Sequence, residues 1–235
     1  MNARWFGLKV ARWFVLPGAL VLVPPLFACS RLPSYARPQG ALMDPSAVDG
    51  EELIEYRALT REDFKGKKPV GEAAEHMDAM GAQTYAIVRP DPTLKIWITG
   101  TQQPNGATHY EGKITEVLHF RAEMDRLRSW WNPNLKEVPE AYVLQHEQTH
   151  FAIAAAEARK LNAQAAELTA RMHARGGSQE EVRDAIQKKL DDVIRGALDD
   201  LMDRNGKFDE DTSARYDPKK QGEWFRRVTA ELGEK

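Results

Sequence analysis

Short apolar runs in the first half of the chain have the residue types of β-strands. Each run is rich in β-branched or aromatic residues and is bounded by proline or glycine, which is typical of strands. The four runs are Leu53 to Leu59, Thr84 to Val88, Leu94 to Thr99 and Ile114 to Phe120. Asp91 and Pro92 lie between the second and third runs, so we expect these two strands to form a hairpin with a short loop.

The spacing of the apolar residues changes after Pro133 from a period of two to about 3.6, the period of an α-helix. Pro139 suits the first position of a helix. One face of this helix carries Val143, His146, His150, Ile153 and Glu157, at steps of three and four residues. No breaker follows before Gly176 and Gly177, so the pattern predicts one helix from Pro139 to this glycine pair.

Two more helices are predicted towards the end of the chain. Ser178 followed by Glu181 is a capping-box pattern, and we expect the helix that it opens to end near the Asn-Gly pair at 205–206. This helix and the preceding one would form an antiparallel hairpin. Asp217 and Pro218 combine a cap with a first-turn proline and begin a final helix. Its apolar stripe consists of Trp224, Val228 and Leu232.

These elements predict an α+β fold with an N-terminal antiparallel β region, a long helix and a C-terminal helical hairpin. A chain of 235 residues holds one substantial core, so we expect residues 51–235 to form one domain. Residues 29–50 are rich in proline, glycine, alanine and serine with little apolar periodicity. This composition predicts a flexible tether in front of the domain.

Residues 1–28 have the composition of a signal peptide. They contain three basic residues and no acidic one, followed by short apolar runs that prolines interrupt. These runs are shorter than the roughly 20 apolar residues of a membrane-spanning helix. The formal net charge of the whole chain is −2, so residues 29–235 carry about −5. Nothing in this charge balance indicates a nucleic-acid partner.

Cys29 is the only cysteine in the chain and directly follows the signal peptide, in Leu26-Phe27-Ala28-Cys29-Ser30. A lone thiol in an oxidising compartment has no disulfide partner in this chain, which is explained if its sulfur carries a lipid. The segment resembles the lipobox of bacterial lipoproteins, whose cysteine is acylated and becomes the mature N-terminus. The resemblance implies a membrane anchor at Cys29. Ser30, rather than aspartate, implies an outer-membrane lipoprotein of the bacterial cell envelope that faces the periplasm.

The motif His146-Glu147-Gln148-Thr149-His150 carries the strongest indication of chemistry. Histidines four residues apart present both imidazoles to one point, where zinc can bind at ~2.0–2.1 Å from each nitrogen. Glu147 lies one residue further round the helix, within reach of a water molecule at the metal. We expect it to act as the general base of a hydrolytic reaction, most simply of a peptide bond. The alternative is a helix with two partly buried, hydrogen-bonded histidines.

A third zinc ligand is less clearly indicated by the residues. Glu157 shares the histidine face, but about 10 Å of helical rise separates it from His150, so we expect it to orient a neighbouring group from outside the ligand set. Glu167 and His173 fall in the predicted continuation of the same helix and point elsewhere. A ligand from the segment Asp209 to Asp217, which follows the helical hairpin, is sterically more favourable.

The chain resembles a bacterial family of secreted zinc-dependent proteases known as domain of unknown function number 922, in a lipoprotein form. The resemblance rests on three stretches that occur in the order of the family. They are Leu59 to Gly66; Ser129-Trp130, Leu144 to Phe151 and Ala158 to Leu161; and Phe208-Asp209, Thr212, Gln221 and Trp224. It implies a zincin-like metallopeptidase domain with zinc as cofactor and a peptide or protein substrate in the envelope.

The sequence also departs from the pattern of this family. Ala214 stands where a histidine is expected, and Ala152 and Ala155 stand where acidic residues are expected. Either another residue substitutes as the third ligand, or the protein has kept the scaffold and lost turnover. The candidate substitutes are Asp209, Asp211, Tyr216 and Asp217.

Three functional hypotheses follow from these features. The leading one is an exported zinc-dependent peptidase in which His146 and His150 bind the metal and Glu147 activates water. The second is a non-catalytic envelope lipoprotein, an adaptor or binding module, that keeps a degenerate protease scaffold; a closed site with three or four protein ligands and no position for water would favour it. The third is a metal-dependent amidase that acts on the cell wall.

Overall fold

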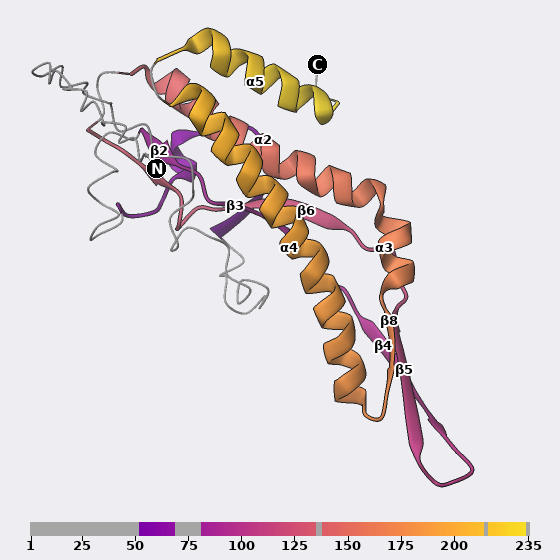
Figure 1. The fold of residues 1–235 in the computed structure, drawn as a ribbon. Helices are drawn as coiled ribbons and strands as arrows, with labels where there is room; N and C mark the ends of the chain where they lie inside the picture. Colours follow the sequence, from indigo (N-terminus) through magenta and orange to yellow (C-terminus); the bar gives the residue numbers. More distant parts are fainter. Residues whose placement is uncertain (1–51, 69–80, 135–137, 214–215, 234–235) are drawn as a thin grey trace, which may run out of the picture.

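A computed structural model describes residues 52–68, 81–134, 138–213 and 216–233 of the chain. The fold is α+β: antiparallel strands form small sheets, and two long helices pack on them. The molecule is elongated, with helices α2, α4 and α5 side by side at one end and a long β-hairpin projecting from the other (Figure 1). The predicted fold class is confirmed at this level.

The first sheet contains three strands in the order β1-β6-β3. The strands are β1 (Leu53–Glu55), β3 (Ala86–Pro90) and β6 (Phe120–Asp125). Helix α2 (Glu140–Ala163) packs against β6 and β3. Phe151, Ile153 and Ala154 of this helix are inaccessible to solvent. A two-stranded sheet of β2 (Ala82–Gln83) and β7 (Trp130–Trp131) lies beside it.

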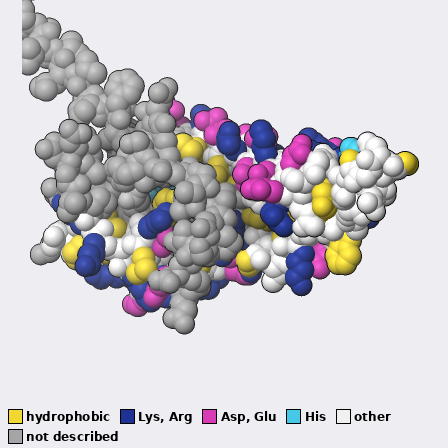
Figure 2. Space-filling view, turned by 90° about the horizontal axis from the view of Figure 1, so that it is seen from below, with side chains coloured by type: hydrophobic (Ala, Val, Ile, Leu, Met, Phe, Trp, Pro, Cys, Tyr) yellow, Lys and Arg dark blue, Asp and Glu magenta, His cyan; other side chains and the backbone are white. Residues whose placement is uncertain are grey.

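The second three-stranded sheet forms the projecting arm. Its order is β4-β5-β8, with β4 (Ile96–Gln102), β5 (Thr108–Ile114) and β8 (His173–Gly176). Helix α4 (Gln179–Thr212) packs against β5 so closely that a Cβ atom on Gly112 would lie 2.4 Å from Val182. The end of the arm carries few charges, whereas basic and acidic side chains are interspersed over the rest of the face in Figure 2.

The strand pairing differs from the prediction. The runs before and after Asp91 do not form a hairpin, because β3 pairs with β6 and β4 pairs with β5. The predicted strand Ile114 to Phe120 is the connection between β5 and β6. Its backbone N–H groups bond to helix α3 (Ala165–Arg171) and the residue after it: Leu118 N donates to Thr169 Oγ1, and Ile114 N donates to Met172 O.

The predicted first strand is also shorter than expected, since β1 ends at Glu55 rather than Leu59. Five further strands lie in places where no strand was predicted, apart from Ile114 at the end of β5 and Phe120 at the start of β6; they are β2, β5, β6, β7 and β8. In β5 the sequence Thr108 to Ile114 has only a weak apolar pattern, because one face of the arm is exposed. Its pairing with both β4 and β8 makes it a strand.

The helices are placed as predicted, but two of their ends are not. The first helix does not run to Gly176: α2 ends at Ala163, α3 ends at Arg171, and β8 follows as a strand paired with β5. The second helix does not end near residues 205–206. Helix α4 continues to Thr212 because Leu201, Phe208 and Thr212 extend its buried stripe. Helices α2 and α4 still run antiparallel, with α3 and β8 between them (Figure 1).

The last helix, α5 (Pro218–Glu231), is confirmed together with its signals. The side chain of Asp217 accepts a hydrogen bond from Lys220 N, and Pro218 occupies the first turn. Ser178 likewise caps α4 by accepting a hydrogen bond from Glu181 N. Buried Trp224 and Val228 pack α5 against α2 and α4.

The predicted signal peptide, the tether and Cys29 lie outside the described residues. Within the part of the chain that the structure describes, no helix combines the length and the apolar character needed to cross a membrane.

Candidate metal centre

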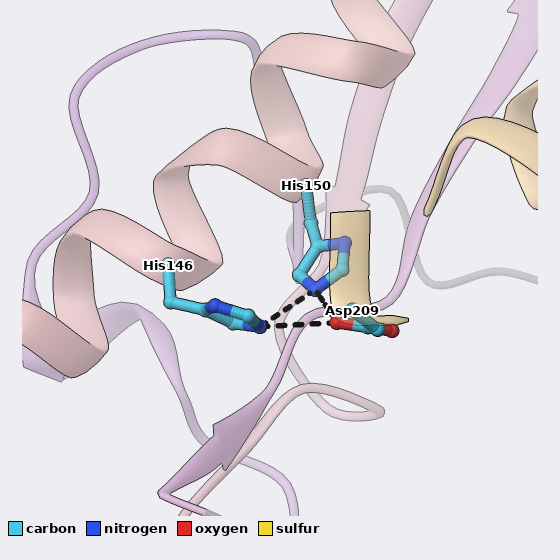
Figure 3. A group of neighbouring side chains, drawn as sticks. All are labelled: His146, His150 and Asp209. Carbon is cyan, nitrogen blue, oxygen red and sulfur yellow. Dashed lines mark hydrogen bonds and ion pairs between the residues drawn. The ribbon is translucent and has the colours of Figure 1, made fainter. Parts of the chain in front are cut away.

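Two histidines on one face of α2 form the first part of the site. His146 and His150 are four residues apart in this helix, so their side chains project in the same direction. Their Nε2 atoms lie 3.1 Å from each other. The two imidazoles therefore converge on one place in front of α2 (Figure 3).

Asp209 on α4 completes a group of three. Its Oδ1 atom lies 3.1 Å from Nε2 of His146 and 3.1 Å from Nε2 of His150. Two nitrogens and one oxygen thus form a nearly equilateral triangle, and this group could hold a metal ion. The three side chains are 13–16% exposed, so solvent reaches them.

The other ring nitrogen of each histidine faces an amide oxygen. His146 Nδ1 lies 3.2 Å from Oε1 of Gln221, and His150 Nδ1 lies 2.9 Å from Oδ1 of Asn205. An amide oxygen only accepts hydrogen bonds, so each Nδ1 carries the proton of the neutral ring. A neutral ring of this form has its Nε2 lone pair free for a metal, whereas without a metal Oδ1 of Asp209 lies within hydrogen-bond distance of both Nε2 atoms.

The arrangement fits a divalent cation. Two lone pairs and a carboxylate oxygen that lie 3.1 Å apart repel one another unless positive charge lies among them. The centre of an equilateral triangle with this edge is about 1.8 Å from each corner, close to the ~2.0–2.2 Å of zinc bonds, so these three residues would hold a zinc ion with little movement. Imidazole nitrogen and carboxylate oxygen are both common zinc donors.

The electrostatics of the site also favour positive charge. Burial lowers the pKa of His150, but the charge and hydrogen bond of Asp209 and the charge of Glu147 raise it by more, to about 9. Burial raises the pKa of Asp209, yet the charge of His150 and the hydrogen bonds of both histidines hold it far below its usual range. A proton on His150 thus supplies the positive charge when no metal is bound.

Glu147 is buried next to this group. Only 3% of the residue is exposed, and its Oε2 atom has no hydrogen-bond partner or ion pair among the described residues. Its charge acts on His150, which places the carboxylate close to the triangle. A buried carboxylate oxygen without a hydrogen-bond partner is costly, and this oxygen is left able to accept a proton.

The other predicted ligands are not brought to the triangle. Glu157 pairs with Arg204 at 3.1 Å and Lys160 at 3.4 Å. Its predicted role of orienting a ligand is therefore not supported by any described contact, because these two cations occupy its carboxylate.

Three residues of the segment after Asp209 have roles in packing and capping. Asp211 bonds to Trp224 Nε1 at 3.0 Å and to Lys220 at 3.1 Å. Tyr216 is exposed and packs against the ring of Tyr142, with centroids 4.6 Å apart. Asp217 caps α5. Of the four candidate substitutes, only Asp209 joins the two histidines.

Sequence reasoning assigned no role in the site to three residues that support it. Phe208 is fully buried and stacks on the ring of His146, with centroids 4.5 Å apart. Asn205 was treated as part of a helix end, although it lies four residues before Asp209 on one helical face. Gln221 was the clearest signal, because it stands three residues before Trp224 in an otherwise apolar stripe. A polar residue at a buried position needs a partner.

Comparisons of the chain with protein-family models, with curated proteins and with solved structures found no match.

Proposed function

We propose that this protein is an exported zinc-dependent peptidase of zincin-like fold, in which His146, His150 and Asp209 hold the metal and Glu147 is the general base. The triangle of Nε2, Nε2 and Oδ1 atoms carries the proposal. Two acidic residues, Asp209 and Glu147, give the site a charge that a divalent ion neutralises. We also propose that the chain belongs to the family of secreted zinc-dependent proteases that it resembles.

The number of ligands supports catalysis over a structural role. Among the described residues, no fourth histidine, cysteine or acidic side chain joins the group. Catalytic zinc sites typically have three protein ligands and an open position, whereas structural sites are closed by four. The partial exposure of the ligands agrees with an open position. This count argues against the hypothesis of a non-catalytic scaffold.

The chain supplies the proton transfers of the proposed reaction. When bound, zinc acts as a Lewis acid and makes a water molecule acidic enough to react near neutral pH. Glu147 would accept a proton from the attacking water at Oε2, which has no hydrogen-bond partner among the described residues, and would later deliver it to the leaving amine. The Nδ1–H groups of His146 and His150 remain bonded to amide oxygens, which keeps both rings in the ligand orientation.

The substitution Glu147→Gln tests the proposal. It keeps the shape of the side chain and removes the base, so kcat for peptide hydrolysis should fall by about 10²–10⁴ while one zinc per chain is retained. Peptide cleavage and zinc content are measured on the same samples. Glu157→Gln is the matched control, since it changes the other buried glutamate of α2 and should leave both values close to those of the natural protein.

Two results would contradict the proposal. If the natural protein binds no zinc after loading, the assignment of the metal fails. If the zinc-loaded Glu147→Gln variant cleaves peptides as fast as the natural protein, Glu147 is not the base. Cell-wall peptides with amide cross-links belong in the substrate panel, because cleavage of these alone would identify an amidase.

We also propose that Cys29 is lipidated and anchors the protein to the outer membrane of a bacterial envelope. The proposal is supported by the signal-peptide composition of residues 1–28 and by the lipobox-like segment before Ser30. Cells that express the protein should incorporate labelled palmitate into it and retain it in the membrane fraction. The Cys29→Ala variant should do neither, and labelling of this variant would refute the assignment.

A further inference from the structure

We infer that Gln221 and Asn205 are positioning residues of the metal centre, and that helix α5, which supplies no ligand, determines how well His146 binds the metal. The inference rests on the proposed zinc site. Gln221 is fully buried, and its Oε1 atom lies 3.2 Å from His146 Nδ1. Asn205 makes the equivalent contact with His150 from α4, at 2.9 Å.

The orientation of the Gln221 amide is fixed by its own partners. Its Nε2 group donates to the carbonyl oxygen of Tyr142 at 2.8 Å and to Oε1 of Gln145 at 3.1 Å. Both partners accept hydrogen bonds, so only the NH₂ group can face them. Oε1 must therefore face His146, and α2 itself holds the amide in this orientation.

The fixed amide selects one tautomer of His146. With the proton on Nδ1, the ring donates to Gln221 and leaves the Nε2 lone pair for a metal. With the proton on Nε2, two acceptors would face each other at the 3.2 Å contact, and the proton would occupy the ligand position. In the second arrangement the ring donates to Oδ1 of Asp209 instead and loses its bond to Gln221, so the amide favours the form of His146 that can bind a metal.

Helix α5 is held against the site by contacts on both sides of Gln221. The backbone N–H of Asp217 donates to the hydroxyl of Tyr142 at 3.2 Å. Trp224 packs against Phe208 with centroids 5.5 Å apart, and Phe208 in turn stacks on His146. The position of α5 and the affinity for metal are therefore coupled, and the coupling is reciprocal.

Both residues are amides rather than acids. A carboxylate at either place would also accept the Nδ1–H bond, but it would add negative charge to a site that already contains Asp209 and Glu147. Two neutral amides fix the rings and leave the charge of the site matched to a divalent ion. The two amides therefore orient the histidine rings and add no charge to the site.

Zinc affinity of the purified full-length chain tests the inference. Gln221→Met keeps the size of the side chain and removes the acceptor, so the Kd for zinc should rise about 10–100-fold. Asn162→Leu is the matched control. Asn162 also ties α2 to another element, through two hydrogen bonds to the backbone of Phe120, but it has no contact with the histidines. Its variant should bind zinc within about threefold of the natural protein.

A second readout separates positioning from a general loss of structure. In metal-free protein, the ¹⁵N shifts of the imidazoles report which nitrogen carries the proton. His146 should have more of the Nδ1–H form in the natural protein than in Gln221→Met, where Asp209 is the remaining acceptor of the ring, and His150 should not change. Equal zinc affinities and an unchanged tautomer in a folded Gln221→Met variant would overturn the inference.

If Gln221→Met does not fold, variants of Asn205 test the inference instead. Asn205→Asp keeps the acceptor for His150 and should retain tight zinc binding, whereas Asn205→Leu should weaken it about 10–100-fold. Equal affinities of these two variants would overturn the inference. Failure of the proposed function would give a different result. A protein that binds zinc and shows these effects but cleaves no peptide would refute the peptidase and leave this inference standing.

Discussion

Helices α2 and α4 enclose acidic side chains between them at two places, and lysine and arginine compensate the charge at only one of them. At the first place, Glu157 of α2 is 3% exposed. Arg204 of α4 binds it at 3.1 Å, and Lys160 adds a second cation at 3.4 Å. Arg204 also reaches Glu231 of α5. Arg204 and Lys160 thus neutralise the buried Glu157. The ion pairs of Arg204 form a clamp that links α2, α4 and α5.

At the second place, Glu147 of α2 and Asp209 of α4 have no such compensation. Among the described residues, no lysine or arginine forms an ion pair with either, and the partners of Asp209 are the two histidines. Burial does not distinguish the two places, because Glu147 and Glu157 are both 3% exposed. What differs is the donor set, which at the second place could hold a metal ion.

The largest effect is expected for Asp209→Asn. The substitution removes one charge and one strong donor of the triangle, so zinc affinity should fall by more than the ~100-fold upper limit expected for a residue outside the ligand set. Because the charge of Asp209 raises the pKa of His150, the substitution also removes the partner of this ring, and the metal-free variant should be less stable than the metal-free natural protein. Competition with a coloured chelator measures the first effect, and urea unfolding measures the second.

The control for Asp209→Asn lies at the other place. Glu157→Gln removes a buried charge from the same helix pair and should change zinc affinity less than threefold, because Glu157 contacts none of the three ligands. If Asp209→Asn bound zinc like the natural protein, the two places would not differ in the way proposed.

A smaller effect, on stability alone, is expected for Arg204→Met. The substitution leaves Glu157 buried without its main partner, and breaking a buried pair costs about 3–5 kcal/mol. Arg204 is 26% exposed and Lys160 remains, so we expect about 2–3 kcal/mol less unfolding free energy in urea. Glu231→Gln removes only the exposed side of the clamp and should cost less than about 1 kcal/mol. A loss of zinc affinity in folded Arg204→Met would contradict the separation of the two places.

The local part of the site could be predicted from the sequence, and the remote part could not. The convergence of His146 and His150 depends only on helical spacing. Asp209 was one of several candidates, because its position depends on where α4 ends. The Asn-Gly pair at 205–206 is a typical helix stop, but the burial of Leu201 and Phe208 on one side of α4 outweighs it. Following that stripe would have placed Asp209 on the histidine side.

The same distinction holds for the fold. The start of α5 was predictable because Asp217 and Pro218 act within one turn of helix. Strand pairing was not, since β3 pairs with a strand more than thirty residues later. Residues His173 to Gly176 continue the helical pattern in sequence, yet they form a strand because they complete the edge of β5. Pairing between distant segments leaves no periodic signal in either one.

The smallest effect is expected at a third buried acid, Asp63, which is 2% exposed. Burial raises its pKa, but hydrogen bonds from Arg57 and from Thr60 N–H lower it by more, so the pKa in the folded protein lies below its usual value. The stability it contributes is therefore complete above about pH 4–5, near the unfolded value of ~3.9, and is lost as the pH falls towards the folded value. Arg57 is 48% exposed, so solvent screens the pair.

Unfolding in urea at a series of acidic pH values tests this compensation. Asp63→Asn should flatten the fall of unfolding free energy below about pH 4 relative to the natural protein. Both proteins are measured without zinc, so that titration of the metal centre contributes equally and cancels in the difference. If the difference in unfolding free energy between the two proteins grew as the pH fell, the carboxylate of Asp63 would not be stabilised by its cations. Asp63 would then not be a further example of a buried acid that cations of the chain compensate.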